Sequence, residues 1–238
     1  MAMLTLADQR VCIVGGTAGM GLALARICAE QGADVVIGGR DGTKAARIAE
    51  ETGPNVTGVA IDVLDAASVA ACFAELGPVD HLVVTAAVVR PGPFRGLDDG
   101  DARATFDGKF WASYNCARLA DVRTSILFFS GNLSSKPATG MVAVGAANAA
   151  LEGLARGLAV ELAPLRVNVI SPGLISGTDA YAGMSGADRE AMYAAKAAQL
   201  PTGRVGSPED VGAMAFSFMV SKQATGSLVV VDGGAVIT

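Results

Sequence analysis

Residues 11–21 read VCIVGGTAGMG, and the helix-forming segment LALARICAEQG follows at residues 22–32. A short apolar run that ends in glycine and continues as a helical pattern is typical of a strand, turn and helix in a parallel sheet. Glycines in such a turn let the backbone approach a pyrophosphate, and the helix N-terminus turns free N–H groups toward it. A turn whose glycines serve the fold alone is the alternative. The pattern favours a dinucleotide site, whose phosphate-binding residues we expect to be Gly15, Thr17, Gly19, Met20 and Gly21.

The same alternation of apolar run and helical segment repeats along the chain. The apolar runs are rich in valine, isoleucine and leucine, which suits strands buried on both faces of a parallel sheet. No internal repeat or linker divides the chain, so we expect one domain at residues 1–238. The pattern predicts an α/β fold with strands at residues 10–14, 34–37, 56–61, 80–85, 125–130, 166–171 and 227–231, and helices at 19–31, 41–52, 66–76, 101–120, 140–163 and 208–220.

The composition excludes several classes of protein. The chain has 238 residues, 51% of them hydrophobic, so it can bury a sizeable core and is not disordered. Lys and Arg number 18 against 23 Asp and Glu, without a basic stripe, which argues against a nucleic-acid partner. No secretory leader or uninterrupted apolar stretch of about 18 residues occurs, so we expect a cytoplasmic protein without a membrane partner. The four cysteines are scattered, and no cluster has the spacing of metal ligands, so we expect buried thiols and no metal.

Arg40 follows the second expected strand, where a dinucleotide fold that prefers NAD carries an acid for the ribose 2′-hydroxyl. Asp41 is better placed to cap the next helix. A guanidinium at this point can pair with a 2′-phosphate, so NADP(H) is the expected cofactor; a merely solvated arginine is the alternative. Asp62-Val63 ends the third strand, where the acid is placed to accept a hydrogen bond from the adenine amino group.

Together these motifs resemble the short-chain dehydrogenase/reductase family over nearly the whole chain. They occur in the family's order and spacing: the glycine turn, Asp62-Val63, DHLV at residues 80–83, RVNVISPG at 166–173 and VDGG at 231–234. The family implies a single Rossmann domain, doubly wound with about seven mostly parallel strands, and a nicotinamide cofactor at the carboxyl ends of the strands. It also implies a small-molecule substrate, a substrate lid at about residues 176–200 and a homotetramer or homodimer. By position, the resemblance places Ala86, Ala87, Asn148, Pro172, Gly173 and Ile175 beside the cofactor.

The resemblance breaks at the residues that transfer the proton in this family. The family uses a tyrosine acid, a lysine four residues later, a serine thirteen residues before the tyrosine, and an asparagine in the preceding helix. Aligned on VGAANAAL, residues 144–151, the chain has Val144 at the tyrosine, Asn148 at the lysine, Gly131 at the serine and Lys109 at the asparagine. General acid catalysis contributes ~10²–10⁴ in rate, so without this acid we expect slow reduction of a plain carbonyl unless another donor replaces it.

Three residues are candidates to replace the lost groups. Lys109 and Asn148 look like an exchange of the family's asparagine and lysine, which would bring a cation to the nicotinamide ribose from the opposite helix; a structural ion pair of Lys109 is the alternative. Tyr181, in the lid, is the phenol placed to reach the pocket, or else it packs on the lid surface. Ser130 begins a polar loop that borders the site, although loops are commonly polar. His81 starts a strand, away from the carboxyl ends, and is not expected to act as a base.

The resemblance and Arg40 lead us to expect an atypical NADP(H)-dependent short-chain oxidoreductase. It would transfer hydride to or from a small apolar or activated substrate, such as a ketone, an imine or a quinone-like ring, because such electrophiles need little help from an enzyme acid. Two alternatives remain. One is a non-catalytic dinucleotide-binding protein that the nucleotide stabilises, and the other is a lyase, isomerase or cyclase that uses the same pocket without net redox. Turnover of NADPH separates the first hypothesis from both.

Overall fold

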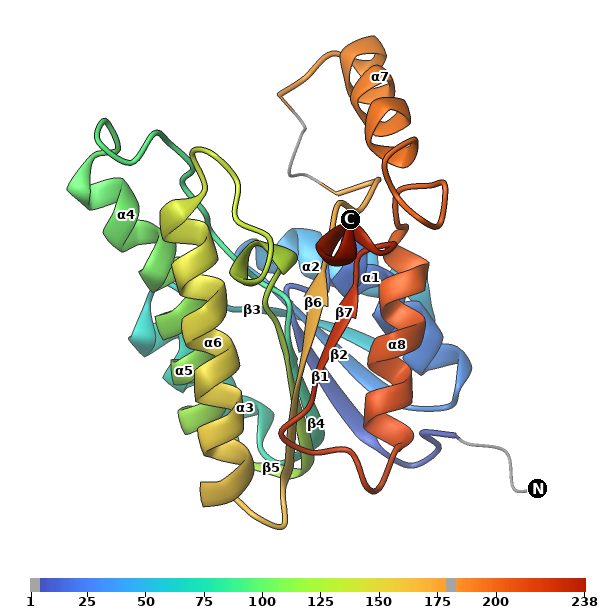
Figure 1. Cartoon of the computed structure of the whole chain (residues 1–238). Coiled ribbons are helices and arrows are strands. Elements are labelled where there is room, and N and C mark those ends of the chain that lie inside the picture. Colours follow the sequence, from blue (N-terminus) through green and yellow to red (C-terminus); the bar gives the residue numbers. More distant parts are fainter. Residues whose placement is uncertain (1–4, 179–182) are drawn as a thin grey trace.

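The molecule is built around one sheet with helices on both of its faces (Figure 1). The computed structural model describes residues 5–178 and 183–238. In these residues seven parallel strands lie in the order β3-β2-β1-β4-β5-β6-β7. They are β1 (Arg10–Val14), β2 (Asp34–Gly39), β3 (Val56–Ala60), β4 (Val79–Val84), β5 (Val122–Phe129), β6 (Arg166–Pro172) and β7 (Leu228–Val231). The expected single-domain α/β fold with a seven-stranded parallel sheet is confirmed.

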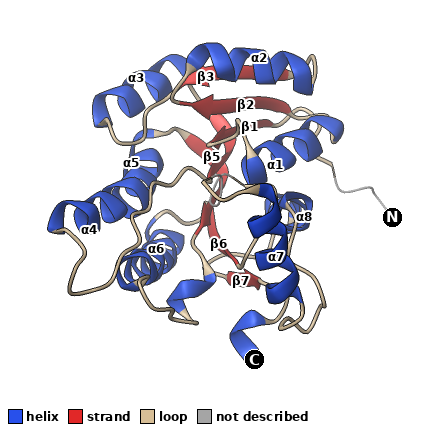
Figure 2. Cartoon of the chain, turned by 90° about the horizontal axis from the view of Figure 1, so that it is seen from above, coloured by secondary structure: helices blue, strands red, loops and turns tan. Residues whose placement is uncertain are grey.

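Two helical layers cover the sheet, each over its own apolar core (Figure 2). The helices are α1 (Gly19–Glu30), α2 (Gly42–Thr52), α3 (Ala66–Leu76), α4 (Asp99–Phe106), α5 (Ala112–Leu119), α6 (Val142–Glu161), α7 (Gly186–Ala197) and α8 (Pro208–Val220). Helices α1, α2 and α8 pack on one face, where Leu24 and Val211 are fully buried. Helices α3, α5 and α6 cover the other face through Phe73, Cys116 and Leu151. None of the helices in the described ranges is long and apolar enough to cross a membrane.

Local signals in the sequence set where helices begin. Asp41 is the N-cap of α2, as expected, and its carboxylate accepts the Lys44 N–H at 3.0 Å. Ser207 and Asp210 form a reciprocal capping box at the start of α8, with Pro208 in the first turn. Each cap contributes about 1 kcal/mol because it satisfies a backbone donor that the helix leaves free.

The helix expected at residues 101–120 is present as an unbroken helical run, with two differences from the prediction. The helix starts earlier, because the Asp98 carboxylate accepts the Gly100 N–H at 2.7 Å and caps α4. A π-helical turn, η1 (Asp107–Trp111), then separates α4 from α5. An extra residue in one turn has no clear signal in helix propensity, although such turns occur often at functional sites. Here the turn carries Lys109 into the protein interior.

The strand order reverses at β1, which lies between β2 and β4. The chain continues from β1 to β2 on one side and from β4 to β5 on the other, so the connections after the neighbouring strands β1 and β4 run in opposite directions. In doubly wound sheets the crevice between two such connections is where ligands bind. Figure 1 shows α7 standing beyond the carboxyl ends of the strands. This helix lies within residues 176–200, where the lid was expected, and its N-cap is Ser185, whose hydroxyl accepts the Asp188 N–H at 3.2 Å.

Candidate functional site

The turn between β1 and α1 is a cradle of bare backbone. Gly15 has φ +92°, and a Cβ there would lie 2.5 Å from the Ala86 backbone nitrogen. A Cβ at Gly21 would lie 2.3 Å from the Gly15 carbonyl oxygen. Gly19 opens α1 with φ +52°, and its N-cap, Ala18, makes no side-chain hydrogen bond to the first N–H groups. The glycines let this turn pack closely, and the helix start without a side-chain cap leaves N–H groups that suit an anion such as a diphosphate.

A cavity of about 160 Å³ lies beside this cradle, at the carboxyl ends of β1 to β4. Asp62 stands on its wall, and its Oδ1 accepts the Leu64 N–H at 3.0 Å, which fixes the carboxylate there. Met20 and Gly19 belong to the first turn of α1 and are not part of the wall. The cavity brings together seven of the fourteen residues that the sequence assigned to the cofactor: Gly15, Thr17, Arg40, Asp62, Val63, Ala86 and Ala87.

Arg40 lies on the cavity wall with an unengaged charge. Among residues 5–178 and 183–238, no carboxylate forms a salt bridge with it. Its neighbour Asp41 is occupied as the cap of α2. A guanidinium on the wall of this cavity, with no salt-bridge partner of its own among these residues, is suited to a phosphate.

Lys109 is buried at the opposite end of the crevice. It is 7% exposed, and its Nζ donates a hydrogen bond to the Ser130 carbonyl oxygen at 2.9 Å. Burial lowers the pKa of Lys109 from 10.5 to about 8, while the negative charge of Glu152 opposes this shift. The structural ion pair considered as an alternative is absent from the described residues, where Lys109 has no salt bridge.

Asn148 lies on α6 and holds the next carbonyl of the same loop. Its Nδ2 donates to the Gly131 oxygen at 3.1 Å, and a Cβ at Gly131 would lie 2.8 Å from that Nδ2. Its Oδ1 is buried and accepts no hydrogen bond from the described residues. Val144, one turn earlier on α6, presents only an aliphatic side chain. Lys109 and Asn148 therefore meet at two consecutive carbonyls, and Asn148 leaves one acceptor without a donor.

Ser130 turns its hydroxyl toward α6. The hydroxyl donates to Glu152 Oε1 at 3.0 Å, and the Ser134 hydroxyl donates to the same oxygen at 2.7 Å. Glu152 was not among the expected site residues. The available signal was its place on α6, four residues and about one turn after Asn148, on the face that packs against this loop.

The segment after β6 closes another side of the crevice. The Gly173 N–H donates to the Val231 oxygen at 3.0 Å, and a Cβ at Gly173 would lie 2.6 Å from the Asp232 Cβ. Pro172 ends β6, and Ile175, 4% exposed, makes a parallel bridge to Gly206. Tyr181, the expected phenol of the lid, lies outside the described residues.

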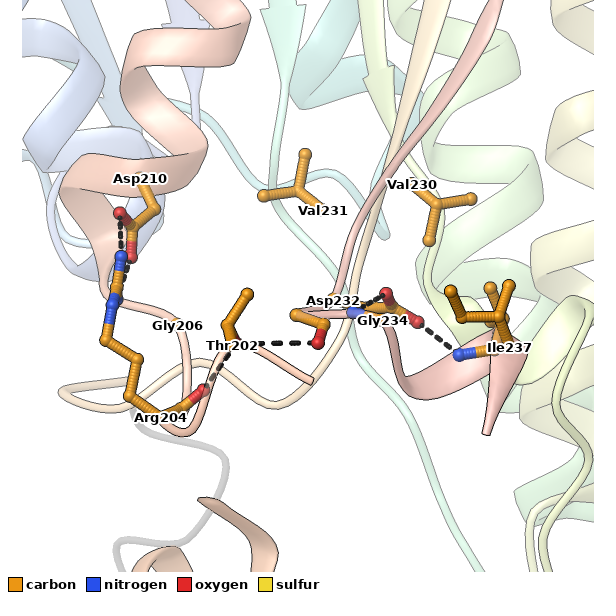
Figure 3. Close-up of a pocket in the computed structure, with 11 residues that line it drawn as sticks. Thr202, Arg204, Gly206, Asp210, Val230, Val231, Asp232, Gly234 and Ile237 are labelled. Atoms are coloured by element: carbon orange, nitrogen blue, oxygen red, sulfur yellow. Dashed lines mark hydrogen bonds and ion pairs between the residues drawn. The ribbon is translucent and has the colours of Figure 1, made fainter. Parts of the chain in front are cut away.

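A second cavity, of about 550 Å³, lies at the carboxyl end of β7 (Figure 3). None of the expected site residues lines it. Its charged groups are already engaged, because the Arg204 guanidinium binds both Asp210 carboxylate oxygens, at 2.6 and 2.7 Å. The Asp232 carboxylate accepts the N–H groups of Gly234 and Val236, both at 2.9 Å. The Asp232 contacts fix the turn after β7, and the Arg204–Asp210 pair fixes the loop at the start of α8.

Comparison with known proteins extends over almost all of this fold. A family model described as "Enoyl-(Acyl carrier protein) reductase" matches residues 15–236. A 3-oxoacyl-[acyl-carrier-protein] reductase, FabG, of Chlamydia muridarum is 31% identical over 96% of this chain and 98% of its own length. The chain belongs to the short-chain dehydrogenase/reductase family.

Solved structures agree with this assignment. A small-chain dehydrogenase crystallised in complex with NADPH is 36% identical and superposes with a TM-score of 0.83, covering 97% of this chain and 99% of its own. The MalC Reductase/Diels-Alderase from Malbranchea aurantiaca is 28% identical, with a TM-score of 0.90 and 98% of each chain covered. The dehydrogenase/reductase family that the sequence resembled is thereby confirmed, together with its fold.

Proposed function

We propose that the protein is an NADP(H)-dependent oxidoreductase that transfers hydride to or from a small apolar or activated substrate, such as a ketone, an imine or a quinone-like ring. The observation that carries the proposal is the bare glycine cradle beside a cavity whose wall holds an unpaired Arg40. Arg40 forms no salt bridge among the described residues, so its charge is available to a phosphate. The NADPH complex of a related small-chain dehydrogenase supports the same choice of nucleotide.

Each end of the crevice has its own task in this proposal. The cradle of Gly15, Gly19 and Gly21 binds the diphosphate, and Arg40 binds the 2′-phosphate in a charge-assisted pair. The carboxylate of Asp62, on the wall of the cavity, accepts a hydrogen bond from the adenine amino group. The same nucleotide, when bound, supplies or accepts the hydride.

At the nicotinamide end, the residues of the chain supply a positive charge and a hydrogen-bond acceptor for the cofactor, but no strong proton donor for the substrate. Asn148 Oδ1, buried without a donor among the described residues, accepts a ribose hydroxyl. Lys109 holds a positive charge against the loop after β5 and stabilises negative charge that develops nearby. Val144 cannot protonate an alkoxide, so we propose substrates whose reduction needs no strong acid. Tyr181 stays our candidate donor from the lid, and Ser130 contributes chiefly the carbonyl that receives Lys109.

The likeness to a protein named both reductase and Diels-Alderase favours one second candidate, a cyclase or other lyase or isomerase without net redox. The aliphatic Val144 suits a pocket that encloses an apolar substrate and orients it. Conversion of a substrate without loss of NADPH would identify this activity. Nucleotide binding without any conversion would indicate the non-catalytic alternative.

The first test is a titration with NADPH and NADH, followed by energy transfer from Trp111, the single tryptophan, and by calorimetry. We expect micromolar binding of NADPH and weaker binding of NADH, then NADPH oxidation with some member of an iminium, quinone and ketone panel. Arg40→Ala should remove the preference, while Arg47→Ala, an exposed arginine paired with Glu51 on the next helix, should keep it. Absence of binding to either nucleotide would refute the proposal.

The proposal includes a cytoplasmic homotetramer or homodimer. Its support is the family resemblance, the four free cysteines and an exposed aromatic group on η1 and α5. Trp111 is 48% exposed and packs edge-on against Phe110 and Tyr114, with ring centroids 5.0 and 5.4 Å apart. Analytical ultracentrifugation of the wild type and of Trp111→Ala tests the assembly. We expect an oligomer for the wild type and a weaker oligomer for the variant if this aromatic group joins subunits. A monomeric wild type would exclude the assembly.

A further inference from the structure

A buried acid on α6 has no part in the function proposed above. Glu152 is 7% exposed, and its Oε1 accepts the hydroxyls of Ser130 and Ser134 at 3.0 and 2.7 Å. Ser130 also receives Lys109, whose Nζ donates to its carbonyl oxygen at 2.9 Å. Ser130, in the loop after β5, thus contacts both the buried carboxylate of Glu152 and the buried ammonium of Lys109.

Glu152 and Lys109 are buried on two sides of Ser130, whose hydroxyl donates to the carboxylate and whose carbonyl oxygen accepts the ammonium. No salt bridge joins the two among the described residues, yet the carboxylate attracts the ammonium through a poorly solvated interior and counters the effect of burial on the pKa of Lys109. No other carboxylate on η1 or on the helices that pack against it forms a salt bridge with Lys109; these acids are Asp99, Asp101, Asp107 and Glu161, and the cations there are Arg103, Arg118 and Arg156.

We propose that Glu152 is a positioning residue that keeps Lys109 protonated and directed at the loop after β5, so that the nicotinamide end of the crevice carries a positive charge at neutral pH. The inference rests on the proposed function only for the role of this positive charge, which is to act on the bound cofactor and substrate. Without Glu152, Lys109 is an uncompensated buried cation, which loses its proton more readily.

The two serine hydroxyls make this arrangement possible. A buried carboxylate is unfavourable unless hydrogen bonds replace its water, and Ser130 and Ser134 supply two such bonds to one oxygen. The same bonds fix the loop whose carbonyls hold Lys109 and Asn148. Charge and geometry at the nicotinamide end therefore depend on one acid that stands outside the crevice chemistry.

The decisive variant is Glu152→Gln, because a glutamine oxygen still accepts both hydroxyls while the negative charge is lost. The chain has five lysines, so the ε-carbon resonance of Lys109 can be assigned with Lys109→Met and followed against pH in labelled protein. In the wild type we expect Lys109 to titrate near pH 8. In Glu152→Gln the midpoint should fall by about one pH unit.

Two further variants control for structural effects. Glu161→Gln, at an exposed position of the same helix, should leave the Lys109 midpoint unchanged. Glu152→Asp keeps the charge and should keep the midpoint close to that of the wild type. An unchanged midpoint in Glu152→Gln overturns the inference.

A double-mutant cycle keeps the inference testable if Glu152→Gln is unstable. In urea at neutral pH, adding Lys109→Met should restore most of the stability that Glu152→Gln loses, because it removes the unpaired cation. If the two losses simply add, Glu152 is structural and the inference fails. Binding of NADPH is measured separately: a protein that shows the midpoint shift but binds no NADPH refutes the proposed function and leaves the role of Glu152 intact.

Discussion

Lys109→Met gives a prediction whose size follows from the structure. Because burial lowers the pKa of Lys109 from 10.5 to about 8, the folded protein binds this proton less tightly than the unfolded chain does. Holding the ammonium in the folded state at pH 7 then costs about 3 kcal/mol. As pH rises through the interval from 8 to 10.5, the folded state releases the proton first, so this cost declines and stability rises.

The comparison with Lys109→Met isolates this effect. The wild type should gain about 2 to 3 kcal/mol relative to the variant between about pH 7 and about pH 10, because methionine has no proton to release. The variant also loses the hydrogen bond to the Ser130 oxygen, which costs about 1 to 3 kcal/mol at every pH. At neutral pH the two effects oppose each other, so we expect Lys109→Met to be as stable as the wild type or slightly more stable.

Urea unfolding of both proteins across this pH range measures the difference, and Lys222→Met, on an exposed loop position, is the matched control. The same samples are titrated with NADPH, and Lys109→Met should bind it more weakly at neutral pH. A stability difference that does not change with pH would refute the assignment of Lys109 as a perturbed buried cation. Unchanged NADPH affinity together with a lowered melting temperature would make Lys109 a purely structural residue.

Three further predictions concern single sites. Arg40→Ala should weaken NADPH binding at least about tenfold more than NADH binding; equal losses in calorimetry would exclude a 2′-phosphate contact. Burial, with a smaller effect of Arg166, lowers the pKa of His81 from 6.5 to about 4, so the folded state excludes a proton that the unfolded state binds. Stability should therefore fall by up to about 3 kcal/mol as pH drops through that interval, and His81→Gln should reduce this loss in urea unfolding. Gly131→Ser should destabilise the protein because its Cβ meets Asn148 Nδ2 at 2.8 Å, and Asn148→Ala should relieve that effect; additive losses would argue against the clash.

Much of the frame follows from local signals. β1 and α3 begin and end at the predicted residues. The bounds of β1 follow from an apolar run between turn residues, and the start of α3 follows from the N-cap Asp65, so both depend on residues that are close in sequence. The glycine turn was also predictable, since φ +92° at Gly15 and its contact with Ala86 are demands that only glycine meets. At residues 101–120 the helix was predictable but its π turn was not, because helix-forming residues surround that turn.

The candidate site divides in the same way. The meeting of the residues around the cavity of about 160 Å³ could be predicted because they lie within a few positions of strand ends, and parallel strands bring their carboxyl ends to one edge. The nicotinamide end could be predicted only as a set of positions. Nothing in the sequence indicated that Glu152 accepts two hydroxyls from the loop after β5, because those residues are 18 and 22 positions away.

The sequence by itself determined the α/β alternation, the glycine cradle, the caps of α2 and α8, and the replacement of tyrosine and lysine by Val144 and Asn148. Those features depend on residue type and on spacing over a few positions, and the periodicity of helices and strands converts such local patterns directly into structure. Only the tertiary structure decided that Lys109 is buried against Ser130 while Glu152 attracts it from α6. The pKa of a buried group depends on the solvent and charges that folding removes or brings near, and these are set by contacts between distant segments of the chain.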